Sequence, residues 1–364
     1  MISMALTAVA YALTAFFAAV CILPLTGSHK WWIRAMDFPR VHYLLVLGPT
    51  AAFVAWAAPP GRWALLALLA AAFVYQAWRI WPYTPLHGKE IRFAAENSGS
   101  PAPVIEAMAS NVLMENEDHE AVLAVLRDRD PDIAFFMETN DRWAEALKPA
   151  LDRYPHVTWH PKDDYYGLIF ATRLKVREMD IRYLTVEETP TLFAELEDAQ
   201  GTVFRFVGMH PKPPTPGVDT EERDDQLYYS ARFARDSTVP VVIMGDFNAV
   251  AWSHPAHKFK RIGEYLDPRI GRGPLPSFDA TSRLMRFPID QLYITPDIAL
   301  LSFSRGPEVG SDHFPMFARF RMDKGEAARL NARPWVPPDD YRATTEARVA
   351  RYRERLQLTR SDDT

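Results

Sequence analysis

The sequence is poor in cysteine: Cys21 is the single one among 364 residues. An intramolecular disulfide and a zinc site built from cysteines are therefore excluded. The sequence also lacks a P-loop, a GxGxxG dinucleotide motif and a GxSxG nucleophile elbow. Hydrophobic residues make up 48% and charged residues 24%. This composition excludes a disordered or collagen-like chain and allows one or two domains with a sizeable core.

Charge is missing from long stretches of the N-terminal part. Residues 3–24 and 41–59 contain no charged side chain, and the apolar run over 63–81 is interrupted only by Arg79. A helix of about 20 apolar residues is long enough to cross a bilayer. Tryptophans cluster at the ends of these segments, as they do in interfacial aromatic belts. We therefore predict three transmembrane helices within residues 1–82.

Three alternatives for this region remain: two membrane spans, a buried helical hairpin, or a cleaved signal peptide, which the uncharged Met1–Thr7 disfavours. Lysine and arginine concentrate on one side of the predicted spans, whereas the opposite side carries only Arg62. The richer side holds Lys30, Arg34, Arg40, Arg79, Lys89 and Arg92. The positive-inside rule then places the C-terminal domain in the cytoplasm of a multi-pass membrane protein, although a periplasmic domain stays open.

The remainder of the chain is acidic. Residues 1–92 contain seven Lys or Arg and two acidic residues, which leaves 34 basic and 44 acidic residues in 93–364, a net charge of −10. Proteins that bind nucleic acid usually carry a basic surface, because neutralising phosphates supplies most of their non-specific affinity. Nucleic acid is therefore the less favoured partner, unless a local basic groove lies within the acidic total.

Composition divides this remainder into three parts. Residues 83–103 are a linker, 104–322 a folded domain, and 323–364 a charged tail with a helix expected over Thr344–Leu358. Within the domain, short apolar runs alternate with helical patterns such as His119–Arg129, which indicates an α/β (α+β) fold. The expected strands are VIEAMASNV, PDIAFFME, GLIFAT, VFRFVGMH, VPVVIMGDFN, IDQLYIT and MFARFRM.

Polar side chains recur where these apolar strands begin or end. They are Asn111, Glu138, His210, Asp246, Asn248, Asp290, Asp312 and His313. Converging strand ends are where α/β proteins build their sites. Carboxylate and amide oxygens suit Mg²⁺ or Mn²⁺, and histidines can transfer protons or stabilise developing charge. Such a set favours metal-assisted hydrolysis of a phosphate ester. Taken singly, each residue has an ordinary alternative role as a cap, a turn or an ion-pair partner.

Residues 104–320 resemble the endonuclease/exonuclease/phosphatase superfamily of DNase I-like enzymes. The resemblance rests on short motifs in the family's order: SNVLMEN, DPDIAFFMET, YYGLIFATR, GMHPKPP, MGDFNAVAWS, PIDQLYIT and GSDHFPM. It is nearest to a bacterial branch with N-terminal transmembrane segments, which implies the bacterial inner membrane. The family fold implies a four-layer αββα sandwich of two packed mixed β-sheets, here preceded by a small transmembrane helical region.

The resemblance also implies roles for single residues. Glu138 matches the main metal ligand, with Asn111 and Asp312 completing the Mg²⁺ or Mn²⁺ site. Asp246 matches the residue that orients or deprotonates the attacking water, and Asn248 the one that holds the phosphate. The remaining matches are His210 and His313, which flank the scissile phosphate, and Asp290, which fixes one imidazole.

Some positions depart from the family pattern or stay open. Gln291 stands where the family has histidine, so an auxiliary role there is in doubt. Tyr165 or Tyr166 matches a tyrosine that contacts phosphate, with the register open. His254 and His257 have the i, i+3 spacing of a metal pair, but we interpret them as surface residues because an oxygen-rich site needs no imidazole ligand.

Three functions are compatible with these features. The first is a membrane-anchored, divalent-metal-dependent phosphoesterase that acts on a lipid-linked or membrane-proximal phosphate ester. An acidic domain beside anionic lipid needs local compensation, for which Arg173 and Lys212 are candidates. The second is a membrane-anchored nuclease, and the third is an inactive membrane scaffold. The sequence carries no signal for an oligomeric state.

Overall fold

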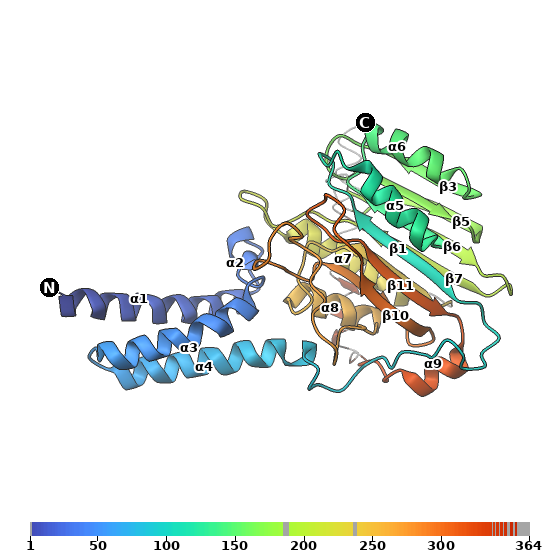
Figure 1. Cartoon of the computed structure of the whole chain (residues 1–364). Coiled ribbons are helices and arrows are strands. Elements are labelled where there is room, and N and C mark those ends of the chain that lie inside the picture. Colours follow the sequence, from blue (N-terminus) through green and yellow to red (C-terminus); the bar gives the residue numbers. More distant parts are fainter. Residues whose placement is uncertain are drawn as a thin grey trace.

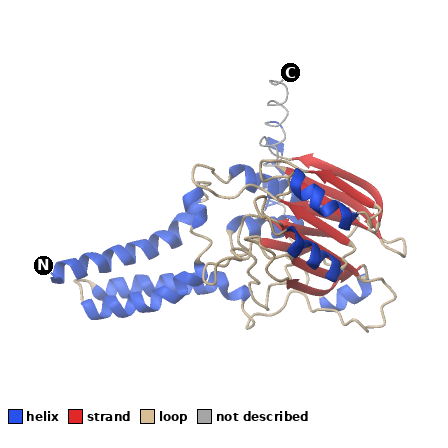
Figure 2. Ribbon diagram, turned by 45° about the horizontal axis from the view of Figure 1, so that its top comes forward, coloured by secondary structure: helices blue, strands red, loops and turns tan. Residues whose placement is uncertain are grey.

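The computed structural model describes residues 2–184, 189–235 and 239–336, together with scattered positions between 338 and 354. An elongated bundle of N-terminal helices projects from an α/β body (Figure 1). The helices of the bundle lie side by side, and the strands of the body run in two layers with helices on the outside (Figure 2).

The helical bundle consists of α1 (Ile2–Ile22), α3 (Arg40–Ala57) and α4 (Arg62–Ile80), with the short α2 (Trp31–Ala35) at the end nearest the body. Phe17, Leu47 and Leu69 are among the side chains that pack between the three long helices. One polar network is buried in the bundle: Arg40 donates to Asp37 at 2.5 Å and to Gln76 at 2.7 Å. This network fixes α3 against α4 at the end of the bundle nearest the body.

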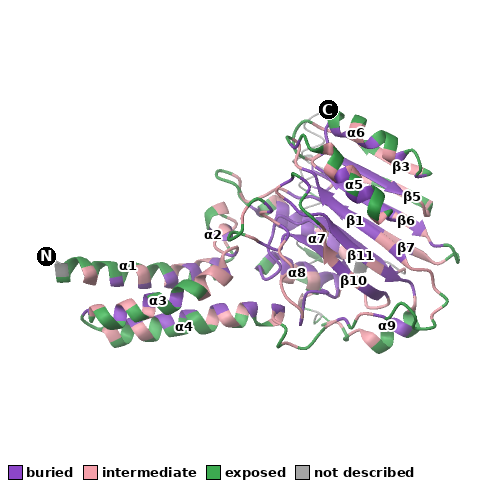
Figure 3. Ribbon diagram, viewed as in Figure 1, coloured by how far each residue is buried: buried purple, intermediate pink, exposed green. Residues whose placement is uncertain are grey.

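Many residues of the bundle are exposed or partly exposed (Figure 3), and they include large apolar side chains such as Val9, Leu45 and Leu68. Ser3–Thr26 and Arg62–Tyr83 are long and apolar enough to cross a membrane by length and composition. At 1.5 Å per residue the 19 residues of α4 span about 28 Å, close to the thickness of a hydrocarbon core. Exposed tryptophans lie at both ends of α4, with Trp63 at its start and Trp78 near its end. Two of the three predicted spans therefore meet these criteria.

The first sheet holds six strands in the order β10-β11-β1-β2-β4-β3. Strands β1 and β2 are parallel and the other neighbours are antiparallel. The bounds are β1 (Ile105–Asn111), β2 (Ile133–Met137), β3 (His156–His160), β4 (Leu168–Thr172), β10 (Ala299–Arg305) and β11 (Met316–Arg321).

The second sheet holds five strands in the order β5-β6-β7-β8-β9. Strands β7 and β8 are parallel and the other pairs are antiparallel. The bounds are β5 (Lys175–Tyr183), β6 (Pro190–Glu197), β7 (Val203–Met209), β8 (Val241–Asp246) and β9 (Asp290–Ile294).

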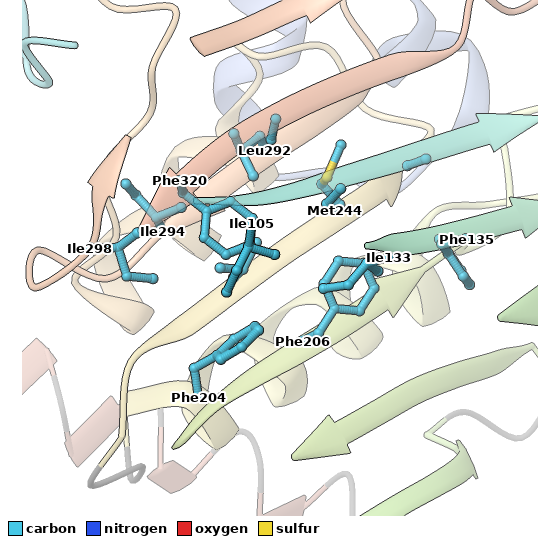
Figure 4. Packing of buried hydrophobic residues seen from close by; sticks show 14 of the residues in the cluster. Ile105, Ile133, Phe135, Phe204, Phe206, Met244, Leu292, Ile294, Ile298 and Phe320 are labelled. Carbon is cyan, nitrogen blue, oxygen red and sulfur yellow. The ribbon is translucent and has the colours of Figure 1, made fainter. Parts of the chain in front are cut away.

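The main hydrophobic core lies between the two sheets. Figure 4 shows Phe135 of the first sheet and Phe206 and Met244 of the second within this layer. Helices α5 (His119–Arg129) and α6 (Asp141–Leu151) pack on the outer face of the first sheet. Helices α7 (Glu221–Arg235) and α8 (His254–Gly263) pack on the outer face of the second. The predicted αββα sandwich is therefore confirmed.

All seven expected strands and the helix over His119–Arg129 are present. The segment 83–103 packs along the body, because Ile91 is fully buried and bridges to Asn331. The tail begins with α9 (Lys324–Leu330), and most of the helix expected over Thr344–Leu358 lies outside the described residues.

Candidate active site

The sheet topology gathers the polar strand ends at one end of the sandwich. In the first sheet, β1 and β2 are parallel and in register, with Asn111 opposite Met137, so Glu138 follows at the same edge. In the second sheet, β9 runs antiparallel to β8 and places Asp290 opposite Asp246. Strand β7 is parallel to β8 and ends one residue before His210. Polar residues from segments far apart in the sequence therefore lie close together at one end of the sandwich.

Asn111 links the two sheets within the site. Its amide donates to Glu138 Oε1 at 2.7 Å and lies 3.4 Å from Asp246 Oδ2. Burial raises the pKa of Glu138, and the Asp312 carboxylate adds to that rise. The other oxygen of Glu138 is buried and has no hydrogen-bond partner among the described residues. A buried carboxylate oxygen without a partner leaves a coordination position for a cation.

His313 is held between two buried carboxylates. Its Nδ1 lies 2.7 Å from Asp290 Oδ2, and its Nε2 lies 3.6 Å from Asp246 Oδ2. Burial alone lowers the pKa of His313, but Asp290 and Asp246 outweigh that effect and raise it to about 10. The ring is therefore a cation at neutral pH, able to donate from Nε2 to an oxygen that gains negative charge.

His210 has the opposite electrostatic character. Burial, together with the cationic His313, lowers its pKa to about 3, so the ring is neutral. Its Nε2 lies 3.7 Å from both Glu138 Oε1 and Asp246 Oδ2. The ring of Tyr166 lies beside it, with the two centroids 5.5 Å apart. Tyr165 instead donates to Glu115. Of the two tyrosines that the sequence left open, Tyr166 is therefore the one that lies at the site.

The loop after β8 has a constrained backbone. Asp246 accepts the backbone N–H of Asn248 at 2.8 Å, and the Asn248 side chain donates to the carbonyl of Pro211 at 2.9 Å. Both Asn248 and Glu138 have positive φ, at 47° and 61°. Non-glycine residues in this conformation are strained, and they concentrate at functional sites.

The carboxylates of the site repel one another, and the cationic His313 offsets only part of this repulsion. Burial raises the pKa of Asp246 and of Asp312, and neighbouring carboxylates add to each rise. Together with the unpartnered oxygen of Glu138, this donor set fits a hard divalent cation. Glu138, Asn111 and Asp312 would hold it.

A second set of possible ligand atoms overlaps the first. Asp246, Asp290 and His313 each offer an atom within 4.8 Å of the others. However, the short contact with Asp290 and the raised pKa of His313 favour a protonated ring, and a protonated imidazole does not bind metal. We therefore assign this set to proton and charge handling.

The geometry bears on two interpretations made from the sequence. Gln291 is buried, accepts from Arg269 at 2.9 Å and from Tyr293 at 2.6 Å, and donates to the carbonyl of Ala249. It therefore packs against the loop after β8, in keeping with the doubt about an auxiliary role. Arg173 pairs with Asp130, at the end of β4 opposite to the site, because Thr172 lies across from Ile133. The suggestion that Arg173 compensates charge near the site is therefore wrong.

Three positioning residues were not singled out from the sequence. Ser311 donates to the carbonyl of Asn111 at 2.8 Å, and Ser277 accepts the backbone N–H of Asp290 at 3.0 Å. The ring of Phe278 packs against His313 with the centroids 4.9 Å apart. Ser277 and Phe278 come from a long irregular segment without periodicity. Ser311 could have been found, since it is the first residue of the SDH motif.

Comparison with known proteins agrees with this geometry. Residues 108–313 match the model of the Endonuclease/Exonuclease/phosphatase family, which covers more than half of the chain. The chain therefore belongs to this family of hydrolases that act on phosphoester bonds with divalent metals. No curated protein sequence matches it. The branch with N-terminal transmembrane segments stays a prediction.

Solved structures share the fold. Humanised TDP2 of D. rerio aligns with a TM-score of 0.52 at 16% identity, over 60% of this chain and 99% of that one. The catalytic domain of human Nocturnin with a bound sulfate anion aligns at 0.50 and 18%, over 60% and 94%. A family protein from Bacteroides thetaiotaomicron aligns at 0.50 and 17%, over 62% and 100%. At these identities the similarity shows the fold alone.

Proposed function

We propose that the protein is a membrane-anchored, divalent-metal-dependent phosphoesterase that hydrolyses a lipid-linked or membrane-proximal phosphate ester. One observation carries the proposal: two loops that leave the site strands are hydrogen-bonded to the N-terminal helical region. After β7, the backbone N–H of Thr220 donates to the backbone carbonyl of His29 at 2.8 Å, and Lys30 pairs with Asp219 at 2.7 Å. After β8, the indole N–H of Trp252 donates to the backbone carbonyl of Asp37 at 2.7 Å.

This arrangement holds the site next to the region that would enter the bilayer. The segment between Ser277 and Phe287 makes a further connection. The rings of Phe38, just before α3, and Phe287 lie 5.5 Å apart, whereas Phe278 of the same segment packs on His313. A substrate phosphate near the membrane surface would thus be close to the site.

In the proposed hydrolysis, each residue of the site has a separate role. A bound Mg²⁺ or Mn²⁺ would neutralise charge on the phosphate oxygens. Asp246 accepts a proton from the attacking water, and its raised pKa suits a base. His313, kept cationic by Asp290, donates to a phosphate oxygen as charge develops. The neutral His210 and the amide of Asn248 orient the phosphate.

The test is hydrolysis by detergent-solubilised full-length protein with Mg²⁺, offered a mixed bacterial lipid extract and plasmid DNA in parallel. The Glu138→Ala background is subtracted. Release of phosphate or headgroup from lipid, with DNA intact, supports the proposal. DNA nicking that Glu138→Ala abolishes would favour the nuclease instead, and activity on neither substrate would favour the scaffold. A C-terminal reporter active only in the periplasm would overturn the cytoplasmic placement.

A further inference from the structure

A cavity lies away from the strand-end site, where α4 meets α8. It has a volume of about 410 Å³. The end of α4 contributes Trp78 and Arg79, and α8 contributes His254, Lys258 and Arg261. None of its lining residues belongs to the strand-end site, so the reaction proposed above does not explain it.

The cavity is basic in an otherwise acidic body. The sequence of α8, HPAHKFKRIG, contains five histidine, lysine or arginine residues and no acid. The described lining of the cavity contains no acidic residue, and its basic or imidazole side chains are Arg79, His254, His257, Lys258 and Arg261. A negatively charged group that enters the cavity would therefore meet a lining rich in positive charge.

The pKa values of the two histidines of α8 are both lowered. Burial lowers the pKa of His254, and the cations Arg34 and Lys258 lower it further, against the opposing effect of Asp224. Burial also holds the pKa of His257 well below its ordinary range, with added repulsion from Arg79 and three neighbouring basic side chains. For both imidazoles burial is the main cause of the lowered pKa, and the surrounding positive charge adds to it.

The cavity also adjoins exposed apolar surface. Trp78 is 64% exposed at the end of α4, and Trp81 and Leu86 are exposed just beyond it. Tryptophan prefers the membrane–water interface, so this end of α4 lies at headgroup level if the helix spans a bilayer. Arg79 donates to the carbonyl of Trp252, but its Nε is buried without a hydrogen-bond partner among the described residues.

We infer that this cavity binds the phosphate headgroup of an anionic phospholipid from the leaflet that faces the body. Basic side chains would contact the phosphodiester, and Trp78 would pack against the glycerol and upper acyl region. Headgroup binding would offset the repulsion between an acidic body and an anionic membrane. The inference rests on the proposed membrane anchor, and it is independent of the proposed hydrolysis.

The test uses full-length protein in detergent, with bound lipid counted by native mass spectrometry after addition of phosphatidylglycerol or phosphatidylcholine. The variant Lys258→Gln/Arg261→Gln keeps polar side chains but removes two charges. We expect its affinity for phosphatidylglycerol to fall about thirtyfold. The matched control, Arg142→Gln/Lys148→Gln on the exposed face of α6, should bind like the wild type. Thermal melting checks that both variants are folded.

Each other outcome overturns the inference. Equal binding of the two lipids would show that the cavity does not recognise anionic headgroups. An equal loss of affinity for phosphatidylglycerol in the α6 control would show that binding depends only on the net charge of the protein. Glycerol 1-phosphate binding as tightly as the lipid would make it a site for a soluble phosphate. Glu138→Gln should keep lipid binding, so the headgroup site and the hydrolysis can fail separately.

Discussion

The indole N–H of Trp252 donates to the backbone carbonyl of Asp37 at 2.7 Å, although the two residues are 215 positions apart. Trp252 belongs to the segment that follows Asp246 and Asn248. Beside it, the hydroxyl of Tyr83 donates to the carbonyl of Ala251 at 2.7 Å. The loop that shapes the site and the base of the helical bundle are therefore joined by buried polar contacts.

Trp252→Phe removes this donor and keeps an aromatic ring. We expect a loss of about 1–3 kcal/mol in the free energy of unfolding, because the carbonyl of Asp37 is left without its partner. Thermal melting of the detergent-solubilised protein measures the loss. Trp159→Phe, on the edge strand β3 and 39% exposed, is the control and should change little. Equal melting of both variants would show that the contact contributes nothing.

Glu138→Gln tests the metal site. Activity should fall by at least about 100-fold, and the stabilisation that added Mg²⁺ gives the wild type should disappear. In chelator, however, the variant should melt no lower than the wild type, because a buried carboxylate with a raised pKa has been removed. The exposed Glu145→Gln on α6 serves as control. A variant that keeps its Mg²⁺ response would exclude Glu138 as a main ligand.

The sequence was most informative where a local pattern and the fold agree. Glu138 directly follows the buried strand β2, and Asp246 is the last residue of β8, so an apolar run followed by an acid located both residues. Four strands were not predicted: β3, β5, β6 and β10. The edge strand β3, HVTWH, and the half-exposed β5 have no continuous apolar run. Their assignment depends on pairing with β4 and β6, which is not visible locally.

Partners within the site were less accessible to sequence reasoning. The contact between His313 and Asp290 depends on the position of β9 beside β8. Which of Tyr165 and Tyr166 faces the site depends on one backbone turn, in which Tyr165 has a positive φ. The docking of the helical bundle depends on contacts across long sequence separations, such as Lys30 with Asp219. Such contacts are set by tertiary packing, for which a single sequence gives no periodic signal.

Gly245 of the GDFN motif is required by close packing of β7 and β8. A Cβ at this position would lie 2.1 Å from the carbonyl oxygen of Met209, and φ is 142°. Gly245→Ala should therefore destabilise the protein by more than about 3 kcal/mol, or prevent folding. Gly88→Ala is the control, since a Cβ there meets nothing within 4 Å. Similar melting temperatures for the two variants would contradict this packing.

Leu284 tests whether the segment beside α3 meets the membrane. Its side chain is 82% exposed, and its carbonyl lies 2.7 Å from His42 Nε2 at the start of α3. Leu284→Asp should reduce turnover of a phosphate ester in vesicles several-fold, because burying a carboxylate at the interface is unfavourable. Turnover of a soluble phosphodiester should be unchanged. A parallel loss on both substrates would point to damage within the site instead.

Asp290 sets the pH range over which His313 stays protonated. Since the folded pKa of His313 is raised to about 10, its stabilising interaction with Asp290 is fully present below about pH 6.5, the ordinary value, and is lost as the pH rises through about 10. Wild-type turnover should accordingly lack an alkaline limb below about pH 9.

In Asp290→Asn the largest attraction for the His313 cation is gone, while burial still opposes the charge. The alkaline limb should therefore move down by more than about one pH unit, with turnover at pH 8 falling more than at pH 6. Profiles of kcat/KM for a soluble phosphodiester at fixed Mg²⁺ measure the shift. The exposed Asp163→Asn is the control. An unchanged limb would mean that the proton on His313 does not govern the reaction, and the neutral His210 could not replace it, because burial keeps its pKa near 3.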